Sequence, residues 1–283
     1  MTGPGTDHPA TAHAEGTLPS GQYWQGWTGE DAVGVVVFVH GLHEHGGRYR
    51  HVAERLARSG YASYVADHPG HGRSSGARGN ISSMAGTVDG VDQLVRLAGE
   101  RHPGAPLFVY GHSMGGLVAL TYLTGSPDAR IRGAVISAPA LDTSAANGVQ
   151  RRVAPLLSRV LPNLGVLTLD AEAISRDPEV VRDYRTDPLN HTGKVRARTG
   201  SEMMLATAAI PGRLPALTLP LLVLHGGADR LVPTVASEMV PAHAGSTDLV
   251  RKVYDGLYHE PHNEPEQEQV LDDVVAWLDA HRG

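Results

Sequence analysis

The pentapeptide GHSMG, Gly111 to Gly115, decides the fold of this 283-residue chain. It follows an apolar run at residues 107–110 that is typical of a buried strand, and it opens into a second apolar run at residues 117–120 that is typical of a helix. A G-x-S-x-G sequence between a strand and a helix is the pattern of a nucleophile elbow, a turn so tight that only small neighbours fit. The pattern predicts that the Ser113 hydroxyl stands above a sheet, beside the unpaired N–H groups that begin the following helix.

The composition argues against several classes of protein. The chain has 24 basic and 30 acidic residues, a formal net charge of −6, and therefore no basic footprint for nucleic acid. It has no cysteine, which removes disulfides, thiolate catalysis and zinc-thiolate sites. No apolar run approaches the roughly 18 residues of a membrane span, and the start of the chain lacks the apolar core of a signal peptide. We therefore expect a cytoplasmic protein whose residues 1–19 form a disordered tail.

Apolar runs alternate with amphipathic stretches, which predicts an α/β fold with a mostly parallel sheet and helices on both faces. An earlier strand or hairpin is expected at Tyr23–Trp27. The other strands are expected at Val33–His40, Ala62–Ala66, Leu107–Tyr110, Ile131–Ser137, Leu221–His225 and Leu249–Tyr254. Helices are expected at Tyr49–Ser59, Ser83–Arg101, Met114–Leu123, Val235–Ala242 and Pro265–His281.

The alternation breaks after Ala140. Residues 142–213 contain short helical patterns separated by five prolines, and strand-like runs resume only at Leu219. An insertion between two strands of such a sheet sits at their carboxyl ends, where ligands bind in α/β folds. We therefore predict a cap over the serine at residues 142–213, inserted into a core made of residues 20–141 and 214–283.

Within the predicted cap, one helical face is apolar. Its members are spaced as i, i+3, i+4, i+7 and i+8, and they are Val153, Leu156, Leu157, Val160 and Leu161. Two interpretations remain open, because periodicity does not distinguish them: the face packs inward on the cap, or it contacts lipid.

A catalytic serine needs an adjacent base, and the base needs an acid that orients it. In a fold with this elbow, the expected order along the chain is serine, acid, histidine. The segments HGGADRLVP and YDGLYHEPHNEP place Asp229 and His259 just beyond the ends of two predicted strands. Ser113, Asp229 and His259 are therefore the predicted catalytic triad. Asp142 remains an alternative for the acid, and His262 for the base.

An oxyanion hole needs two backbone N–H donors. We predict one from Met114, directly after the serine, and the other from Leu42 in the loop VFVHGLHEHGGRY that follows an early strand. The same loop carries His43 and His45, which leaves a metal site as an alternative, although no clustered carboxylate or cysteine accompanies them. Ester hydrolysis by these residues requires neither a metal nor an organic cofactor.

Several blocks of sequence together resemble the monoacylglycerol lipases of the α/β-hydrolase superfamily, particularly the bacterial ones. The resemblance runs from about Tyr23 to Leu278. It is carried by HGLHEHGGRY (40–49), DHPGHGRSSG (67–76), GHSMGG (111–116), the cap segment ending in DPL (187–189), GGADRLVP (226–233) and YHEPHNEP (258–265). The absence of cysteine is a departure from some members, so the thiol-directed inhibition known for those members is not expected.

The resemblance implies the same triad, with Leu42 and Met114 as oxyanion donors. It also implies that Glu44, Arg48 and His262 lie near the polar end of the pocket and bind the glycerol headgroup. An alternative for the first two remains open, because Glu44 and Arg48 are four residues apart and can simply pair with each other.

The activity that the resemblance implies is hydrolysis of monoacylglycerols to fatty acid and glycerol through an acyl-enzyme. The same residues would serve a broader carboxylesterase, a lysophospholipase or a thioesterase. Dehalogenases and epoxide hydrolases of this fold use aspartate at the position of Ser113, and non-catalytic receptor or adhesion modules have typically lost a triad member. The expected partner is a lipid ester, with peripheral membrane contact through the cap as a further expectation.

Overall fold

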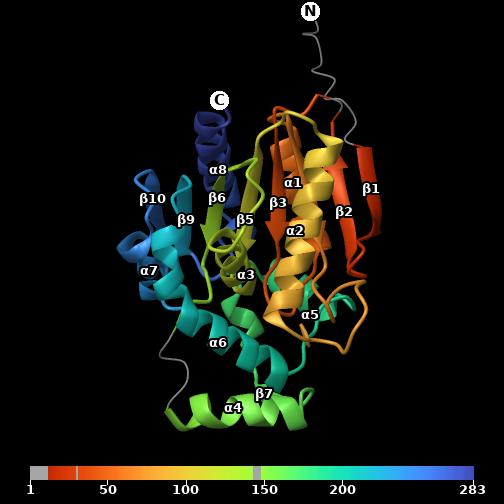
Figure 1. The fold of residues 1–283 in the computed structure, drawn as a ribbon, viewed down its shortest axis with the longest axis vertical. Helices are drawn as coiled ribbons and strands as arrows, with labels where there is room; N and C mark the ends of the chain where they lie inside the picture. The colour runs from red at the N-terminus through yellow and green to blue at the C-terminus, as the bar shows by residue number, and fades with distance from the viewer. Residues whose placement is uncertain (1–11, 30, 143–147) are drawn as a thin grey trace, which may run out of the picture.

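The computed structural model describes residues 12–29, 31–142 and 148–283 (Figure 1). Over these residues the main sheet has eight strands in the order β1-β2-β4-β3-β5-β6-β9-β10. Strands β1 and β2 form an antiparallel hairpin, β2 is antiparallel to β4, and the remaining pairs are parallel. This arrangement confirms the predicted α/β fold. The strands are β1 (Ala12–Thr17), β2 (Tyr23–Thr28), β3 (Gly34–Val39), β4 (Tyr61–Ala66), β5 (Leu107–His112), β6 (Ile131–Ser137), β9 (Leu221–Gly226) and β10 (Leu249–Tyr254).

Helices cover both faces of this sheet, and alternate residues of its central strands meet them. In β3, Val35 and Val37 pack in one core cluster with α2 (Met84–Arg101) and α3 (Met114–Leu123). Val36 and Phe38 pack in the other cluster, with α1 (Arg50–Ala57) and α8 (Gln267–His281). Because successive strand side chains point to opposite faces, a strand covered on both faces is apolar throughout. Helix α7 (Val235–His243) and short 3-10 helices at Gly46–Tyr49, Leu214–Ala216 and Pro261–Asn263 complete the core and its connections, and a further 3-10 helix at Ala171–Ala173 lies between β6 and β9.

The prediction of a disordered tail over residues 1–19 is wrong from residue 12 onward. Strand β1 pairs with β2 along its whole length. The Tyr23 hydroxyl donates to Glu15 at 2.5 Å, and the rings of His13 and Trp27 lie 5.8 Å apart. These contacts are made with β2, so the polar sequence of β1, read alone, does not reveal its pairing. Residues 1–11 of the predicted tail lie outside the described residues.

The chain between β6 and β9 forms a separate group of elements, gathered below the main sheet in Figure 1. It contains the two-stranded sheet of β7 (Gly165–Leu167) and β8 (Val195–Arg196), together with α4 (Gly148–Val160), α5 (Pro178–Thr186) and α6 (Ala197–Arg213). Helix α6 packs against both α3 and α4. None of the described helices combines the length and apolarity needed to cross a membrane.

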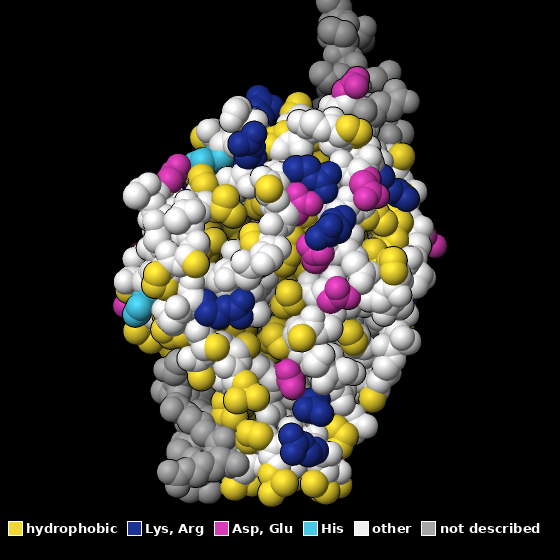
Figure 2. Space-filling model, viewed as in Figure 1, with side chains coloured by type: hydrophobic (Ala, Val, Ile, Leu, Met, Phe, Trp, Pro, Cys, Tyr) yellow, Lys and Arg dark blue, Asp and Glu magenta, His cyan; other side chains and the backbone are white. Residues whose placement is uncertain are grey.

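Apolar side chains cover the outer surface of α4. Val153, Leu156, Val160 and Leu161 have exposed fractions of 50%, 65%, 67% and 51%, and Figure 2 shows hydrophobic side chains at the lower end of the molecule, where α4 lies. The interpretation in which this whole face packs inward is therefore wrong. Two members of the face, Val153 and Leu157, also line a cavity, and Leu157 is only partly exposed.

Candidate active site

Ser113 occupies a strained turn between β5 and α3. Its φ and ψ are 54° and −121°, a region that a residue with a side chain rarely adopts. A Cβ atom on Gly115 would lie 1.9 Å from the carbonyl oxygen of Val39, and one on Gly111 would lie 2.7 Å from the Gly115 oxygen. Both glycines are therefore required by the close approach of the backbone, as the G-x-S-x-G pattern predicts.

Three side chains from separate loops meet at this turn. His259, beyond β10, places its Nε2 atom 2.8 Å from the Ser113 hydroxyl. Its Nδ1 atom lies 2.7 Å from the Oδ2 atom of Asp229, beyond β9. The carboxylate accepts the Nδ1 proton, which leaves Nε2 free to accept the hydroxyl proton. Of the two pairs of alternatives, Asp229 rather than Asp142 meets His259, and His259 rather than His262 meets the serine.

The Asp229 carboxylate is buried and held by four hydrogen bonds. Its Oδ1 accepts from the backbone N–H groups of Leu231 and Val232 at 2.8 and 2.9 Å. Its Oδ2 accepts from His259 and, at 3.1 Å, from Nε2 of His225. Burial raises the pKa of Asp229, but the charge of His259 and these hydrogen bonds lower it by more, so that the net pKa is well below its usual range. Burial lowers the pKa of His259, but the charge of Asp229 outweighs it, and the net pKa is raised.

Two backbone N–H groups beside the serine have no acceptor within the described chain. The loop after β3 passes close to Ser113, because a Cβ on Gly41 would lie 3.3 Å from the serine Cβ. Neither the N–H of Leu42 nor that of Met114 donates to another described residue. Met114 also begins α3, and the serine side chain does not cap that helix. These two donors can therefore serve a negatively charged oxygen formed at the serine.

A cavity of about 1250 Å³ lies beside Ser113 and separates the main sheet from the elements below it. Its apolar walls come mainly from the chain between β6 and β9, including Leu157, Val166, Leu167, Met203, Met204 and Ala208. Its polar wall carries His43, Glu44, Tyr184, His191 and Glu260. The serine therefore faces a space suited to a long apolar group joined to a short polar one.

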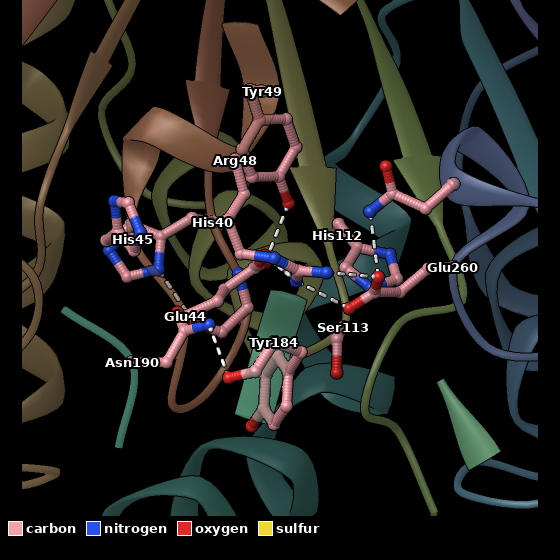
Figure 3. A network of polar contacts seen from close by, with 12 residues as sticks. His40, Glu44, His45, Arg48, Tyr49, His112, Ser113, Tyr184, Asn190 and Glu260 are labelled. Carbon is pink, nitrogen blue, oxygen red and sulfur yellow. Dashed lines mark hydrogen bonds and ion pairs between the residues drawn. The ribbon is translucent and has the colours of Figure 1, made fainter. Parts of the chain in front are cut away.

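Arg48 lies between two carboxylates at the polar end (Figure 3). Its Nη1 donates to Glu44 at 2.6 Å, and its Nη1 and Nη2 donate to the two oxygens of Glu260 at 2.7 Å each. The other oxygen of Glu44 accepts from the Gly41 N–H at 2.5 Å and from the Tyr49 hydroxyl at 2.9 Å. Burial raises the pKa of Glu260, but the guanidinium of Arg48 outweighs it and lowers that pKa to about 2.

The three residues expected to bind glycerol differ in their access to the cavity. Glu44 reaches the wall, but both of its oxygens already accept hydrogen bonds. Arg48 and His262 are not among the described residues that line the cavity. His262 is buried behind the wall, with its ring 4.8 Å from that of His112 and 5.2 Å from that of Tyr49. The Glu44–Arg48 pairing favours the structural alternative, and the glycerol contacts stay a prediction.

Sequence reasoning did not identify Glu260. Its carboxylate accepts hydrogen bonds from Arg48, although the two residues are 212 positions apart in the chain. What the sequence does show is that Glu260 directly follows His259, which places it close to the predicted site. The pairing of Glu44 with Arg48, four residues apart, gave no reason to look for a second carboxylate.

The two histidines considered for a metal site have different surroundings. His45 Nε2 lies 2.9 Å from Asp187, whereas the ring of His43 lies edge-on to that of His191 at 4.6 Å. Among the described residues, no three histidine, aspartate or glutamate side chains form a group that could hold a metal ion.

Comparison with known proteins places this site in a family. A family profile described as serine aminopeptidase, S33, matches residues 30–266. The monoacylglycerol lipase of Mycolicibacterium smegmatis is 43% identical over 90% of this chain and 91% of its own length. Human monoglyceride lipase is 33% identical over 97% of this chain and 91% of its own length. The crystal structure of Paleococcus ferrophilus monoacylglycerol lipase has a TM-score of 0.82 and 32% identity, covering 92% of this chain and 99% of that one. The chain therefore belongs to the serine aminopeptidase S33 family of α/β-hydrolases, among the monoacylglycerol lipases.

Proposed function

We propose that this protein hydrolyses monoacylglycerols to a free fatty acid and glycerol, with Ser113, His259 and Asp229 as its catalytic triad. The observation that carries the proposal is the continuous relay from Asp229 through His259 to the serine hydroxyl, with contacts of 2.7 and 2.8 Å, at one wall of a largely apolar cavity. Likeness to monoacylglycerol lipases along almost the whole chain supports the choice of substrate.

In the first half of the reaction, His259 takes the proton from Ser113 as the hydroxyl oxygen attacks the ester carbonyl carbon. The carbonyl oxygen becomes an oxyanion between the N–H groups of Leu42 and Met114. Asp229 keeps the imidazole in the correct tautomer and stabilises its charged form. The C–O bond to glycerol then breaks, and the imidazolium gives its proton to the departing glycerol oxygen.

In the second half, water replaces glycerol beside His259. The imidazole removes a proton from that water as its oxygen attacks the acyl-enzyme carbonyl, and the same two N–H groups hold the second oxyanion. The proton then returns to the Ser113 oxygen as the fatty acid leaves. Throughout both halves, the acyl chain lies along the apolar walls, and residues 142–213 act as the cap that shields the reaction from bulk water.

The proposal also includes contact between the cap and a lipid surface. Besides Leu156 and Val160 on α4, Leu164, Val166 and Leu167 in the same part of the chain have exposed fractions of 45%, 48% and 57%, and the last two also reach the cavity wall. Exposed apolar side chains of this kind are costly in water and favourable at a membrane interface. Docking through this face would bring the cavity close to the lipid that holds the substrate. A cytoplasmic location stays a prediction.

The test compares wild type with Ser113→Ala on monoolein, and on a lysophospholipid, an acyl thioester and an aminoacyl arylamide. We expect the wild type to have its highest kcat/KM on monoolein, and Ser113→Ala to lose activity and labelling by a fluorophosphonate. A Ser113→Ala protein as active as wild type would sink the proposed triad. A higher kcat/KM on any of the other three substrates would instead sink the proposed substrate class and leave the triad in place.

A further inference from the structure

Arg48 connects two loops that approach Ser113 from different strands. One is the loop after β3, which contains Glu44, and the other is the loop after β10, which contains Glu260 (Figure 3). The guanidinium donates once to Glu44 and twice, in parallel, to Glu260. A bidentate guanidinium–carboxylate pair has a fixed planar geometry, so it sets a distance as well as supplying an attraction.

At one end, the network reaches the backbone of the predicted oxyanion hole. The Glu44 oxygen that faces away from Arg48 accepts the N–H of Gly41 at 2.5 Å. Gly41 directly precedes Leu42, whose N–H is one of the two proposed oxyanion donors. The position of that donor therefore depends on where the Glu44 carboxylate is held.

At the other end, the network reaches the proposed base. Glu260 directly follows His259 in the chain. Its backbone N–H donates to the Ile174 carbonyl at 2.8 Å, and its carboxylate also accepts from the side chain of Asn263 at 2.8 Å. These contacts leave the peptide after His259 little freedom, so the position of the imidazole depends on where Glu260 is held.

The network is shielded from water. The side chains of Glu44, Arg48 and Glu260 have exposed fractions of only 2%, 11% and 5%. The guanidinium carbon of Arg48 also lies 5.1 Å from the centre of the Tyr184 ring, a cation–π contact with α5. Buried charges persist only when they are paired and hydrogen-bonded. Movement of any one of these groups therefore breaks a buried, charge-assisted hydrogen bond of its neighbour, which resists displacement of either loop.

We infer that Arg48 is a positioning residue that, through Glu44 and Glu260, fixes the oxyanion donor of Leu42 relative to the imidazole of His259. This inference rests on the triad and oxyanion roles proposed above. It differs from a glycerol contact, because Arg48 acts through the protein and benefits every ester that the serine attacks. A misplacement of reacting groups by about 1 Å can lower a rate about 100-fold, so the bridge affects the chemical step itself.

The test uses two variants that keep every charge but change the length of the bridge, Arg48→Lys and Glu260→Asp. Each is assayed on monoolein and on p-nitrophenyl butyrate, which has no glycerol. We expect kcat to fall about 10–100-fold on both substrates, with KM changed less than about 3-fold. Glu54→Gln is the matched control. It removes an exposed arginine–carboxylate pair, Arg50–Glu54 on α1, and we expect it to leave kcat unchanged.

A third variant, Glu260→Gln, is used to measure the pH dependence of kcat/KM, which would not change if the bridge only stabilised the fold. Asp229 makes the main contribution that raises the pKa of His259 against burial, and Glu260 adds to it. Removing the charge of Glu260 therefore shifts the acid limb of the kcat/KM profile to lower pH. Thermal unfolding of each variant is measured alongside.

Two results would overturn the inference. Loss confined to monoolein and expressed in KM would assign Arg48 to glycerol binding. A lower melting temperature with wild-type kcat on both substrates, in Arg48→Lys and Glu260→Asp, would leave the bridge a structural role only. Wild-type protein that cleaves p-nitrophenyl butyrate but not monoolein would contradict the proposed substrate and leave this test intact.

Discussion

The Nδ1 atom of His259 lies 2.7 Å from the Oδ2 atom of Asp229, and both side chains are almost completely shielded from solvent. In that environment the carboxylate strongly favours the charged imidazole, and the charged imidazole favours the carboxylate. The pair is therefore suited to a reaction in which the imidazole becomes positively charged and then neutral again in each half.

Replacing Asp229 with asparagine is predicted to lower kcat about 10⁴-fold, the scale of loss when a triad histidine is left in the wrong tautomer. The amide can donate to Nδ1, which places the imidazole proton on Nε2, where it cannot accept from Ser113. Asp255→Asn, which changes an exposed carboxylate beyond β10, is the control. Steady-state kinetics on p-nitrophenyl butyrate measure both variants, and a loss below 10-fold for Asp229→Asn would contradict the assignment of the acid.

The activity of the wild type is predicted to fall on the acid side at a higher pH than an ordinary histidine would give. The proposed base, His259, must be neutral to accept the serine proton, and Asp229, against the effect of burial, raises its pKa above 6.5. The midpoint of the acid limb of kcat/KM is therefore expected above pH 6.5. A pH series on a neutral ester measures it, and a midpoint clearly below 6.5 is the contrary result.

A methyl group at Gly115 is predicted to destabilise the fold, because its carbon would lie 1.9 Å from the Val39 oxygen and 2.4 Å from the His40 oxygen. Both obstacles are backbone atoms, which cannot move aside cheaply. We expect Gly115→Ala to lower the free energy of unfolding by about 2 kcal/mol or more and to lose activity.

Gly212→Ala in α6 is the matched change, because no atom lies within 4 Å of the added methyl. It is expected to stabilise the protein by up to about 1 kcal/mol. Urea unfolding measures the free energy of unfolding of both variants. Equal changes in the two would show that the close backbone approach at Gly115 does not prevent a side chain there.

The outer surface of α4 is predicted to bind lipid. Replacing Leu156 and Val160 together with glutamate removes two side chains that are 65% and 67% exposed, and it leaves Leu157 in the cavity wall untouched. We expect partitioning onto liposomes to fall at least about 10-fold, with kcat on p-nitrophenyl butyrate retained. Val235→Glu, 63% exposed on α7, is the control. Equal flotation of the double variant and wild type would count against membrane docking through this face.

Stability is predicted to fall steeply as the pH drops below 6.5. Burial lowers the pKa of His43, His68 and His262 to about 3, and that of His71 to about 4. Between these values and 6.5 the unfolded chain binds protons that the folded chain does not, so each histidine lowers the free energy of unfolding by about 1.4 kcal/mol per pH unit. Calorimetry from pH 8 to pH 5 measures the effect.

A matched pair of variants isolates this contribution. His71→Asn removes one buried titrating group, and it should reduce the slope of stability with pH by about 1.4 kcal/mol per unit. His243→Asn, which changes an exposed histidine on α7, is the surface control for the substitution. A melting temperature that stays constant between pH 7 and pH 5 would contradict the neutral state of the buried histidines.

Much of the core could be read from the sequence, because its strands are buried on both faces and bounded by turns. Ile131–Ser137 and Leu249–Tyr254 begin and end in the structure at the predicted residues. The helix Met114–Leu123 does the same, because the elbow fixes where it starts. Strand β1 was missed, since an exposed edge strand has no apolar pattern and is defined by its pairing with β2.

Predictions that depended on contacts distant in sequence were less complete. Periodicity identified the apolar face of α4 but carried no information on what covers it, and the structure exposes it. Motif spacing brought Ser113, Asp229 and His259 together, because each follows a strand whose carboxyl end lies at the same edge. The second carboxylate at Arg48 was missed, because Glu260 pairs with it only through the fold.

Helix α6 contributes Met203, Met204 and Ala208 to the apolar wall of the cavity and none of the proposed catalytic residues. Substitutions along this one helix can therefore lengthen, shorten or reshape the space for the hydrocarbon without disturbing the reaction. Natural evolution, or a laboratory library restricted to these positions, can therefore change the preferred acyl-chain length while the catalytic residues stay the same.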